Sequence, residues 1–291
     1  MTVGGAALYP PSPAMATPSS PLHVAEVGQG RPLVLVHGFA TSGRALSGLA
    51  EAVAPAARVL LPDLRGHGRS APPPGLFSLE DHGADVASLV LALGLEDPVL
   101  GGWSLGAQVA LLAAARLARD GVRVAGLALV SATARFTTTD GYPHGLPARE
   151  VEGLAARLAR SPGKALSRFF AAFFAKEELP DPERERALAT LAADPPDVAA
   201  ALGALRALAE GDQRSLAAAL RAPALLLHGE EDRIVPEGAS RFLEEALPRA
   251  RRVAFAGVGH APFLSRGEAC ASELRAFLGS LASPGERSAA R

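Results

Sequence analysis

The chain has little cysteine, few aromatic residues and no surplus of either charge. Its 291 residues include one cysteine and one tryptophan, so no internal disulfide can form. The 29 basic and 30 acidic side chains leave a formal net charge of −1, which argues against a nucleic-acid-binding or membrane-surface protein. No Cys/His spacing suggests a metal site, and we expect no metal and no organic cofactor.

Long hydrophobic runs are also absent. No stretch approaches 18 apolar residues without glycine or charge, so we expect no membrane span. Residues 1–21 are rich in Pro, Ala, Ser and Gly, and they lack the basic start and apolar run of a signal peptide. We therefore predict a disordered tail at 1–21, a cytoplasmic location and a monomer. Cys270 lies in a helical pattern, where we expect an inert, packed thiol.

What the sequence does contain is an alternation of apolar runs and helical stretches. The runs at 33–36, 59–61, 98–101 and 124–130 suit buried parallel strands, and helices are expected between them, at 42–54, 78–93 and 107–117. No strand is expected at 133–213, and alternation resumes with strands at 224–227 and 252–255. The pattern predicts an α/β fold with a mostly parallel central sheet flanked by helices.

The break in this alternation predicts the domain organisation. Helical segments are expected at 148–160, 164–175, 182–193 and 198–210. We interpret 133–213 as an all-helical lid inserted into one α/β core, which consists of residues 22–132 and 214–291.

The most informative motif is Gly102-Trp103-Ser104-Leu105-Gly106, set between an expected strand and an expected helix. A Gly-x-Ser-x-Gly in this position resembles the nucleophile elbow of the α/β-hydrolase fold. Glycines two before and two after the serine relieve crowding in a sharp turn, and the hydroxyl is left exposed at the end of the strand. Ser104 is therefore the candidate nucleophile.

A serine nucleophile needs a base and a carboxylate, in this fold in the order Ser, Asp/Glu, His. Asp232 follows the expected strand at 224–227, and His260 follows the one that ends at Phe255. We predict a triad of Ser104, Asp232 and His260, with Glu230 and Glu231 as alternatives for the carboxylate. His228 is expected to be packed. His23, His67, His82 and His144 are expected in surface segments without a chemical role.

The negative charge that develops on the substrate oxygen needs two donors. We expect them to be the backbone N–H groups of Leu105, which follows the nucleophile, and of Phe39, in the loop His37-Gly38-Phe39. His37 and Gly38 are expected to shape that loop. Trp103 is interpreted as a core side chain first and as pocket lining second.

Together these motifs resemble those of the carboxylesterases of biotin synthesis that cleave pimeloyl-[acyl-carrier protein] methyl ester. The resemblance covers about residues 33–278 and includes Asp232-Arg-Ile-Val-Pro236, His260-Ala-Pro-Phe263 and the lid segment Arg168-Phe-Phe-Ala171. It implies a serine carboxylesterase that releases methanol without a cofactor.

The resemblance also implies binding residues. Phe39 and Leu105 match positions that touch the acyl group, and the segment with Phe169, Phe170 and Phe173 matches one that lines the acyl channel. Trp103 is a further substrate-binding candidate. The partner would be an acidic acyl-carrier protein docked on basic side chains of the lid, for which the candidates are Arg157, Arg160, Lys164, Arg168, Arg184 and Arg186. Ser161-Pro162-Gly163 is expected to interrupt any continuous basic stripe, and the lid also carries many acids, so an ordinary solvated surface stays open.

Two positions depart from that family's pattern. Phe39 stands where tryptophan is common, and Ala107 where a third glycine is usual. Two alternatives remain. One is another hydrolase on the same triad, acting on small esters or C–C bonds or as a perhydrolase. The other is a non-catalytic ligand receptor on the same scaffold.

Overall fold

A seven-stranded sheet forms the centre of the molecule, in the order β1-β3-β2-β4-β5-β6-β7. The structure, a computed structural model, describes residues 22–72 and 75–281. The strands are β1 (Val24–Val27), β2 (Pro32–Val36), β3 (Arg58–Pro62), β4 (Val99–Trp103), β5 (Gly126–Val130), β6 (Ala224–Gly229) and β7 (Ala250–Phe255). β1 pairs antiparallel with β3, and all other pairs are parallel. The predicted fold class, an α/β-hydrolase fold, is confirmed.

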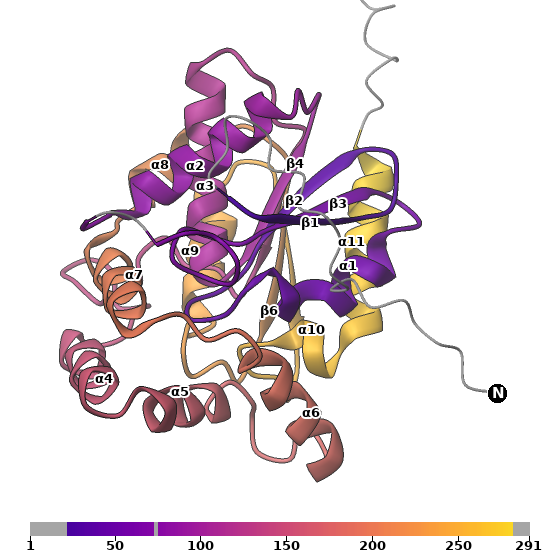
Figure 1. The fold of residues 1–291 in the computed structure, drawn as a ribbon. Helices are drawn as coiled ribbons and strands as arrows, with labels where there is room; N and C mark the ends of the chain where they lie inside the picture. The colour runs from indigo at the N-terminus through magenta and orange to yellow at the C-terminus, as the bar shows by residue number, and fades with distance from the viewer. Residues whose placement is uncertain (1–21, 73–74, 282–291) are drawn as a thin grey trace, which may run out of the picture.

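Helices cover both faces of this sheet (Figure 1). α1 (Ser47–Val53), preceded by the short η1 (Gly43–Leu46), and α11 (Gly267–Ser280) pack together on one face. α2 (Leu79–Ala92), α3 (Leu105–Arg119), α8 (Arg214–Ala219) and α9 (Gly238–Ala246) cover the other. α10 (Pro262–Ser265) leads into α11. Because both faces are covered, the central strands can be apolar throughout, and every residue of β4, β5 and β6 is buried.

Four further helices lie between β5 and β6, beyond the end of the sheet (Figure 1). They are α4 (Ala148–Arg160), α5 (Pro162–Ala171), α6 (Asp181–Leu191) and α7 (Val198–Glu210), and we call them the insert. α4 packs on α5 and α7. It does so because Val151, Leu154 and Leu158, spaced by three and four residues, form one apolar face while most of its other side chains are exposed.

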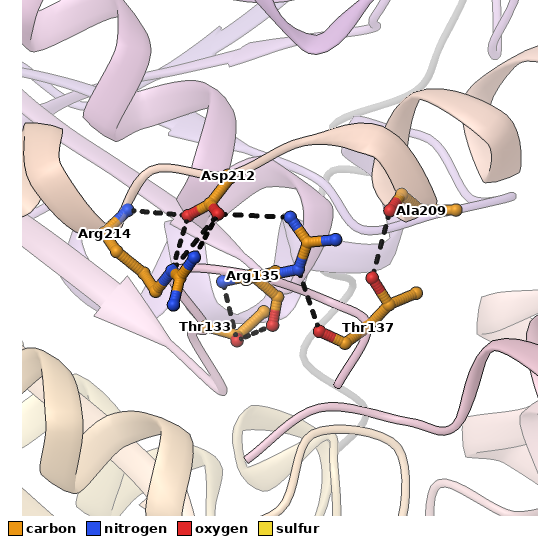
Figure 2. A network of polar contacts seen from close by, with 6 residues as sticks. All are labelled: Thr133, Arg135, Thr137, Ala209, Asp212 and Arg214. Atoms are coloured by element: carbon orange, nitrogen blue, oxygen red, sulfur yellow. Dashed lines mark hydrogen bonds and ion pairs between the residues drawn. The ribbon is translucent and has the colours of Figure 1, made fainter. Parts of the chain in front are cut away.

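The chain enters the insert after β5 and leaves it before α8, and these two connecting segments are hydrogen-bonded to each other (Figure 2). Asp212 accepts hydrogen bonds from Arg135 Nη1 at 3.1 Å and from Arg214 Nη2 at 2.7 Å. The hydroxyl of Thr137 donates to the carbonyl of Ala209 at 3.1 Å. We call Arg135, Asp212 and Arg214 the basal clasp; it joins the segment after β5 to the segment before α8.

Several local predictions agree with the structure. The helix expected at 78–93 is present as α2, and Ser78 and Asp81 form a capping box at its start. Cys270 is fully buried on α11, and burial raises the pKa of its thiol to about 12. The expected tail at 1–21 lies outside the described residues.

Other local predictions were wrong. The short edge strand β1 was not expected from its sequence. His67 and His82, which we expected on the surface, are fully buried. They lie where the loop after β3 and the helix α2 pack against the core, and sequence periodicity does not report that packing.

Candidate active site

Ser104 lies at a sharp turn between β4 and α3. Its backbone is left-handed, with φ 56° and ψ −115°, a conformation that costs energy for any residue other than glycine. A Cβ on Gly102 would lie 2.2 Å from the backbone carbonyl of Gly106, and one on Gly106 would lie 2.1 Å from the carbonyl oxygen of Val36. Only glycine fits at both positions. Ala107 is buried within α3, and its methyl group is accommodated there. The missing third glycine therefore does not disturb the turn.

Asp232 and His260 come together beyond the ends of β6 and β7. Asp232 Oδ2 lies 2.7 Å from His260 Nδ1, and Asp232 Oδ1 accepts the N–H groups of Ile234 and Val235, each at 2.8 Å. A carboxylate accepts at both oxygens, so His260 carries its proton on Nδ1 and leaves Nε2 free to take another. His260 is 1% exposed, and Nε2 has no hydrogen-bond partner among the described residues.

The main chain of His260 is held from two sides. Its N–H donates to the carbonyl of Phe173 at 2.6 Å, and its own carbonyl accepts from Trp103 Nε1 at 2.8 Å. Trp103 is the last residue of β4, next to Ser104, and it is fully buried. This contact links the elbow to the His260 loop. It also makes Trp103 a supporting core side chain, the first of the two roles expected for it.

The loop after β2 is shaped by His37. Its Nδ1 lies 2.8 Å from the carbonyl of Gly38, and its Nε2 accepts the N–H of Leu64 at 3.0 Å, which fixes a neutral ring. Burial lowers the pKa of His37 to about 4. Among the described residues, the N–H groups of Phe39 and Leu105 donate to no backbone or side-chain acceptor. Two preorganised donors of this kind suit a developing oxyanion.

The alternative carboxylates are placed differently from Asp232. Glu230 and Glu231 are exposed, and neither makes a side-chain contact with His260. His228 is fully buried, as expected, and its Nε2 contacts the carbonyl of Val235 at 2.9 Å. Burial lowers the pKa of His228.

Aromatic side chains of the insert reach the same region. The Phe169 ring packs edge-on against Phe39, with centroids 5.5 Å apart, and against Phe173 at 4.9 Å. The Phe173 ring in turn lies 4.9 Å from the ring of His260. Phe170 and Phe173 are buried, whereas Phe169 is partly exposed.

Phe169 lines a cavity of about 620 Å³ between the insert and the core. Phe136, Leu154 and Ile234 supply more of its apolar wall, and four arginines also line it, Arg149, Arg157, Arg168 and Arg233. Its volume lies within the range of small-molecule sites. Ser104, Asp232 and His260 do not line this cavity themselves; Ile234, which does, bonds Asp232 through its backbone N–H.

The basic candidates divide into two groups. The helix is interrupted at Ser161, as expected, with Arg157 and Arg160 at the end of α4 and Lys164 and Arg168 on α5. All four side chains nevertheless line one surface pocket of about 200 Å³. Arg184 is used internally: it donates to the carbonyl of Ala171 at 3.0 Å and lies over the Phe174 ring. Arg186 is exposed on α6.

Sequence reasoning missed Glu178, which lies between α5 and α6. It counted this residue among the solvated acids of the insert, yet the side chain is buried and bonds the His260 loop. No sequence signal distinguishes it from the exposed Glu177 beside it.

The sheet topology and the glycine-flanked serine turn agree with the expected α/β-hydrolase fold, and so do comparisons with known proteins. A family model described as the alpha/beta hydrolase fold matches residues 31–266. The chain therefore belongs to the α/β-hydrolase family.

Particular relatives are esterases. The chain is 34% identical over 251 residues to the pimeloyl-[acyl-carrier protein] methyl ester esterase of Chromobacterium violaceum. The matched region covers 84% of this chain and 92% of the relative. An esterase from Exiguobacterium antarcticum superposes with a TM-score of 0.82 at 26% identity, over 89% of this chain and 96% of that one. A thermophilic esterase from Thermogutta terrifontis gives 0.75 at 30% identity, over 91% and 96%.

Within residues 22–72 and 75–281, no helix is both long and apolar enough to cross a membrane. The same residues contain no group of three or more His, Cys, Asp or Glu side chains placed to hold a metal ion.

Proposed function

We propose that the chain is a serine carboxylesterase that hydrolyses pimeloyl-[acyl-carrier protein] methyl ester in biotin synthesis. The observation that carries this proposal is the buried Asp232–His260 pair, at 2.7 Å, whose histidine loop is bonded by the indole N–H of Trp103, the residue before the strained Ser104. The relative from Chromobacterium violaceum, named for this substrate, supports the choice of ester. A cytoplasmic location fits a chain whose single thiol is buried.

In the proposed reaction, Ser104 Oγ attacks the ester carbonyl carbon and its proton passes to His260 Nε2. Asp232 stabilises the imidazolium through Nδ1. The N–H groups of Leu105 and Phe39 stabilise the oxyanion, each donor contributing on the order of 10²–10³ in rate. Methanol leaves with the proton from His260. Water that gives a proton to His260 then attacks the acyl-enzyme. The bond to Ser104 Oγ breaks, His260 returns the proton to that oxygen, and the free carboxylate is released.

The cavity beside Phe169 is proposed to hold the acyl chain. Its apolar wall suits methylene groups, and Phe39, Phe169 and Phe173 connect it to His260 through ring contacts. Phe170 and Trp103 would support these rings, since Phe170 packs on Phe169 with centroids 6.0 Å apart and Trp103 packs on Phe173 at 5.5 Å. Leu105 is buried beside Ser104 and would act through its backbone N–H.

The carrier protein is proposed to dock where Arg157, Arg160, Lys164 and Arg168 converge. Among the described residues, none of these side chains has an ion-pair partner, so their charges are available to an acidic surface. Arg186 could extend the patch, whereas Arg184 is engaged within the insert.

The test is methanol release from pimeloyl-[acyl-carrier protein] methyl ester, with wild-type protein and Ser104→Ala. We expect release from the wild type only, and rescue of a biotin auxotroph lacking the esterase by the wild-type gene only. Activity on p-nitrophenyl esters without methanol release would instead indicate another hydrolase on this triad. Rescue by Ser104→Ala would indicate a non-catalytic role.

A further inference from the structure

Glu178 is a buried carboxylate for which the proposed reaction has so far no use. It lies in the segment that leaves α5, outside any helix, and it is 7% exposed. Charged side chains are almost never buried to this extent unless they are paired or hydrogen-bonded. Its surroundings therefore need an explanation.

Three donors converge on this carboxylate. Oε2 accepts the N–H of Ala175 at 2.6 Å and that of Gly259 at 2.9 Å, and Oε1 accepts the hydroxyl of Ser265. Ala175 belongs to the insert segment itself. Gly259 and Ser265, in contrast, bracket His260: one directly precedes it and the other ends α10.

The same two segments meet at a second point. The N–H of His260 donates to the carbonyl of Phe173 at 2.6 Å. A Cβ on Gly259 would lie 2.1 Å from that carbonyl oxygen, so the close approach requires glycine there. Residues 173–178 and 259–265 thus form one hydrogen-bonded unit, with His260 at its centre.

We infer that Glu178 is a positioning residue for His260. By bonding both sides of the His260 loop, it fixes the main chain from which the imidazole projects, and it couples that position to docking of the insert. The imidazole must accept a proton from Ser104 and return it to the leaving alcohol, and misplacement by about 1 Å can cost about 10²-fold in rate. The inference rests on the proposed triad.

The test compares Glu178→Ala with Glu178→Gln, using p-nitrophenyl butyrate as substrate. The alanine variant removes all three acceptor contacts, and we expect kcat to fall about 10²-fold with KM nearly unchanged. Glutamine can still accept the two N–H groups with its carbonyl oxygen and donate its amide to Ser265, so we expect it to retain most of the wild-type kcat.

Asp85→Ala is the matched control for stability. Asp85 is also a buried carboxylate, and it bonds Arg65 with both oxygens at 2.6 Å, on α2. We expect this variant to lower the unfolding temperature without changing kcat. Ser265→Ala removes one donor only and provides a milder test if Glu178→Ala does not fold; its kcat should fall by less than that of Glu178→Ala.

Two outcomes would overturn the inference. One is a Glu178→Ala protein, or a Ser265→Ala protein if the former does not fold, with lowered stability and wild-type kcat. The other is an equal loss of kcat in Asp85→Ala. Ser104→Ala separates this result from the parent proposal: if wild-type hydrolysis does not depend on Ser104, the triad is wrong and the inference fails with it.

Discussion

At the scale of single residues, Asp232 divides two tasks between its two oxygens. Oδ1 accepts two backbone N–H groups, and Oδ2 faces His260 Nδ1. The backbone contacts fix the plane of the carboxylate, so the second oxygen is aimed before any substrate arrives. The loop that follows β6 therefore determines which ring nitrogen of His260 carries the proton.

Asp232→Asn should lower kcat about 10⁴-fold. The amide oxygen is needed by the N–H groups of Ile234 and Val235, so the NH₂ group must face His260 Nδ1. That contact places the imidazole proton on Nε2, where it blocks uptake of the Ser104 proton. Initial rates on p-nitrophenyl butyrate measure the loss.

Glu230→Gln and Glu231→Gln are the controls for this substitution, because both side chains are exposed. We expect wild-type rates from each. A loss in either of them comparable with that of Asp232→Asn would show that the carboxylate has been assigned to the wrong residue.

At the scale of secondary-structure elements, the insert is attached to the core in two different ways. The basal clasp links the two segments through which the chain enters and leaves the insert. The contacts of Phe173 and Glu178 link the insert to the His260 loop. The first attachment lies far along the chain from any proposed catalytic group, whereas the second contains one. Substitutions at the two places should therefore have different effects.

Asp212→Ala should loosen the base of the insert and lower the free energy of unfolding by about 1 kcal/mol, because the clasp is partly exposed. Amide hydrogen exchange should accelerate at 133–137 and 209–214, and exchange in β4 should not change. Glu210→Ala is the control, since it removes only an exposed pair with Arg206 on α7. Equal exchange rates in the two variants would contradict a structural role for the clasp.

At the scale of the whole molecule, buried histidines make the fold sensitive to acid. Burial lowers the pKa of His37 to about 4 and that of His67 to about 3, and it lowers the pKa values of His82 and His228 as well. In the unfolded chain the pKa of each of these histidines is about 6.5. Below that pH the unfolded chain binds protons that the folded chain does not bind, so stability falls as pH falls.

We expect the urea midpoint to decrease between about pH 6.5 and pH 4, and to decrease less steeply in His82→Leu. Neither nitrogen of His82 has a hydrogen-bond partner among the described residues, so leucine removes a buried polar group and a titrating one together. Above about pH 7.5 the two proteins should show the same pH dependence. Parallel curves down to pH 4 would contradict this assignment.

These histidines also show where sequence reasoning reached its limit. The family and the parallel sheet could be predicted, because unbroken apolar runs and a Gly-x-Ser-x-Gly turn are local signals. Burial of His67 and His82, the edge strand β1 and the contacts of Glu178 depend on segments distant in the chain. Glu177 and Glu178 are adjacent residues of the same type, and only the fold exposes the first to solvent and brings the second beside Gly259.

Cys270 provides a built-in reporter for these measurements. It is the only sulfhydryl of the chain, it is fully inside the protein on α11, and α11 packs against α1. A thiol reagent will label it only when that helix separates from the sheet, so the labelling rate follows opening of the C-terminal half of the core. The unfolding rate of the unlabelled wild-type protein can thus be measured without attaching a dye beforehand.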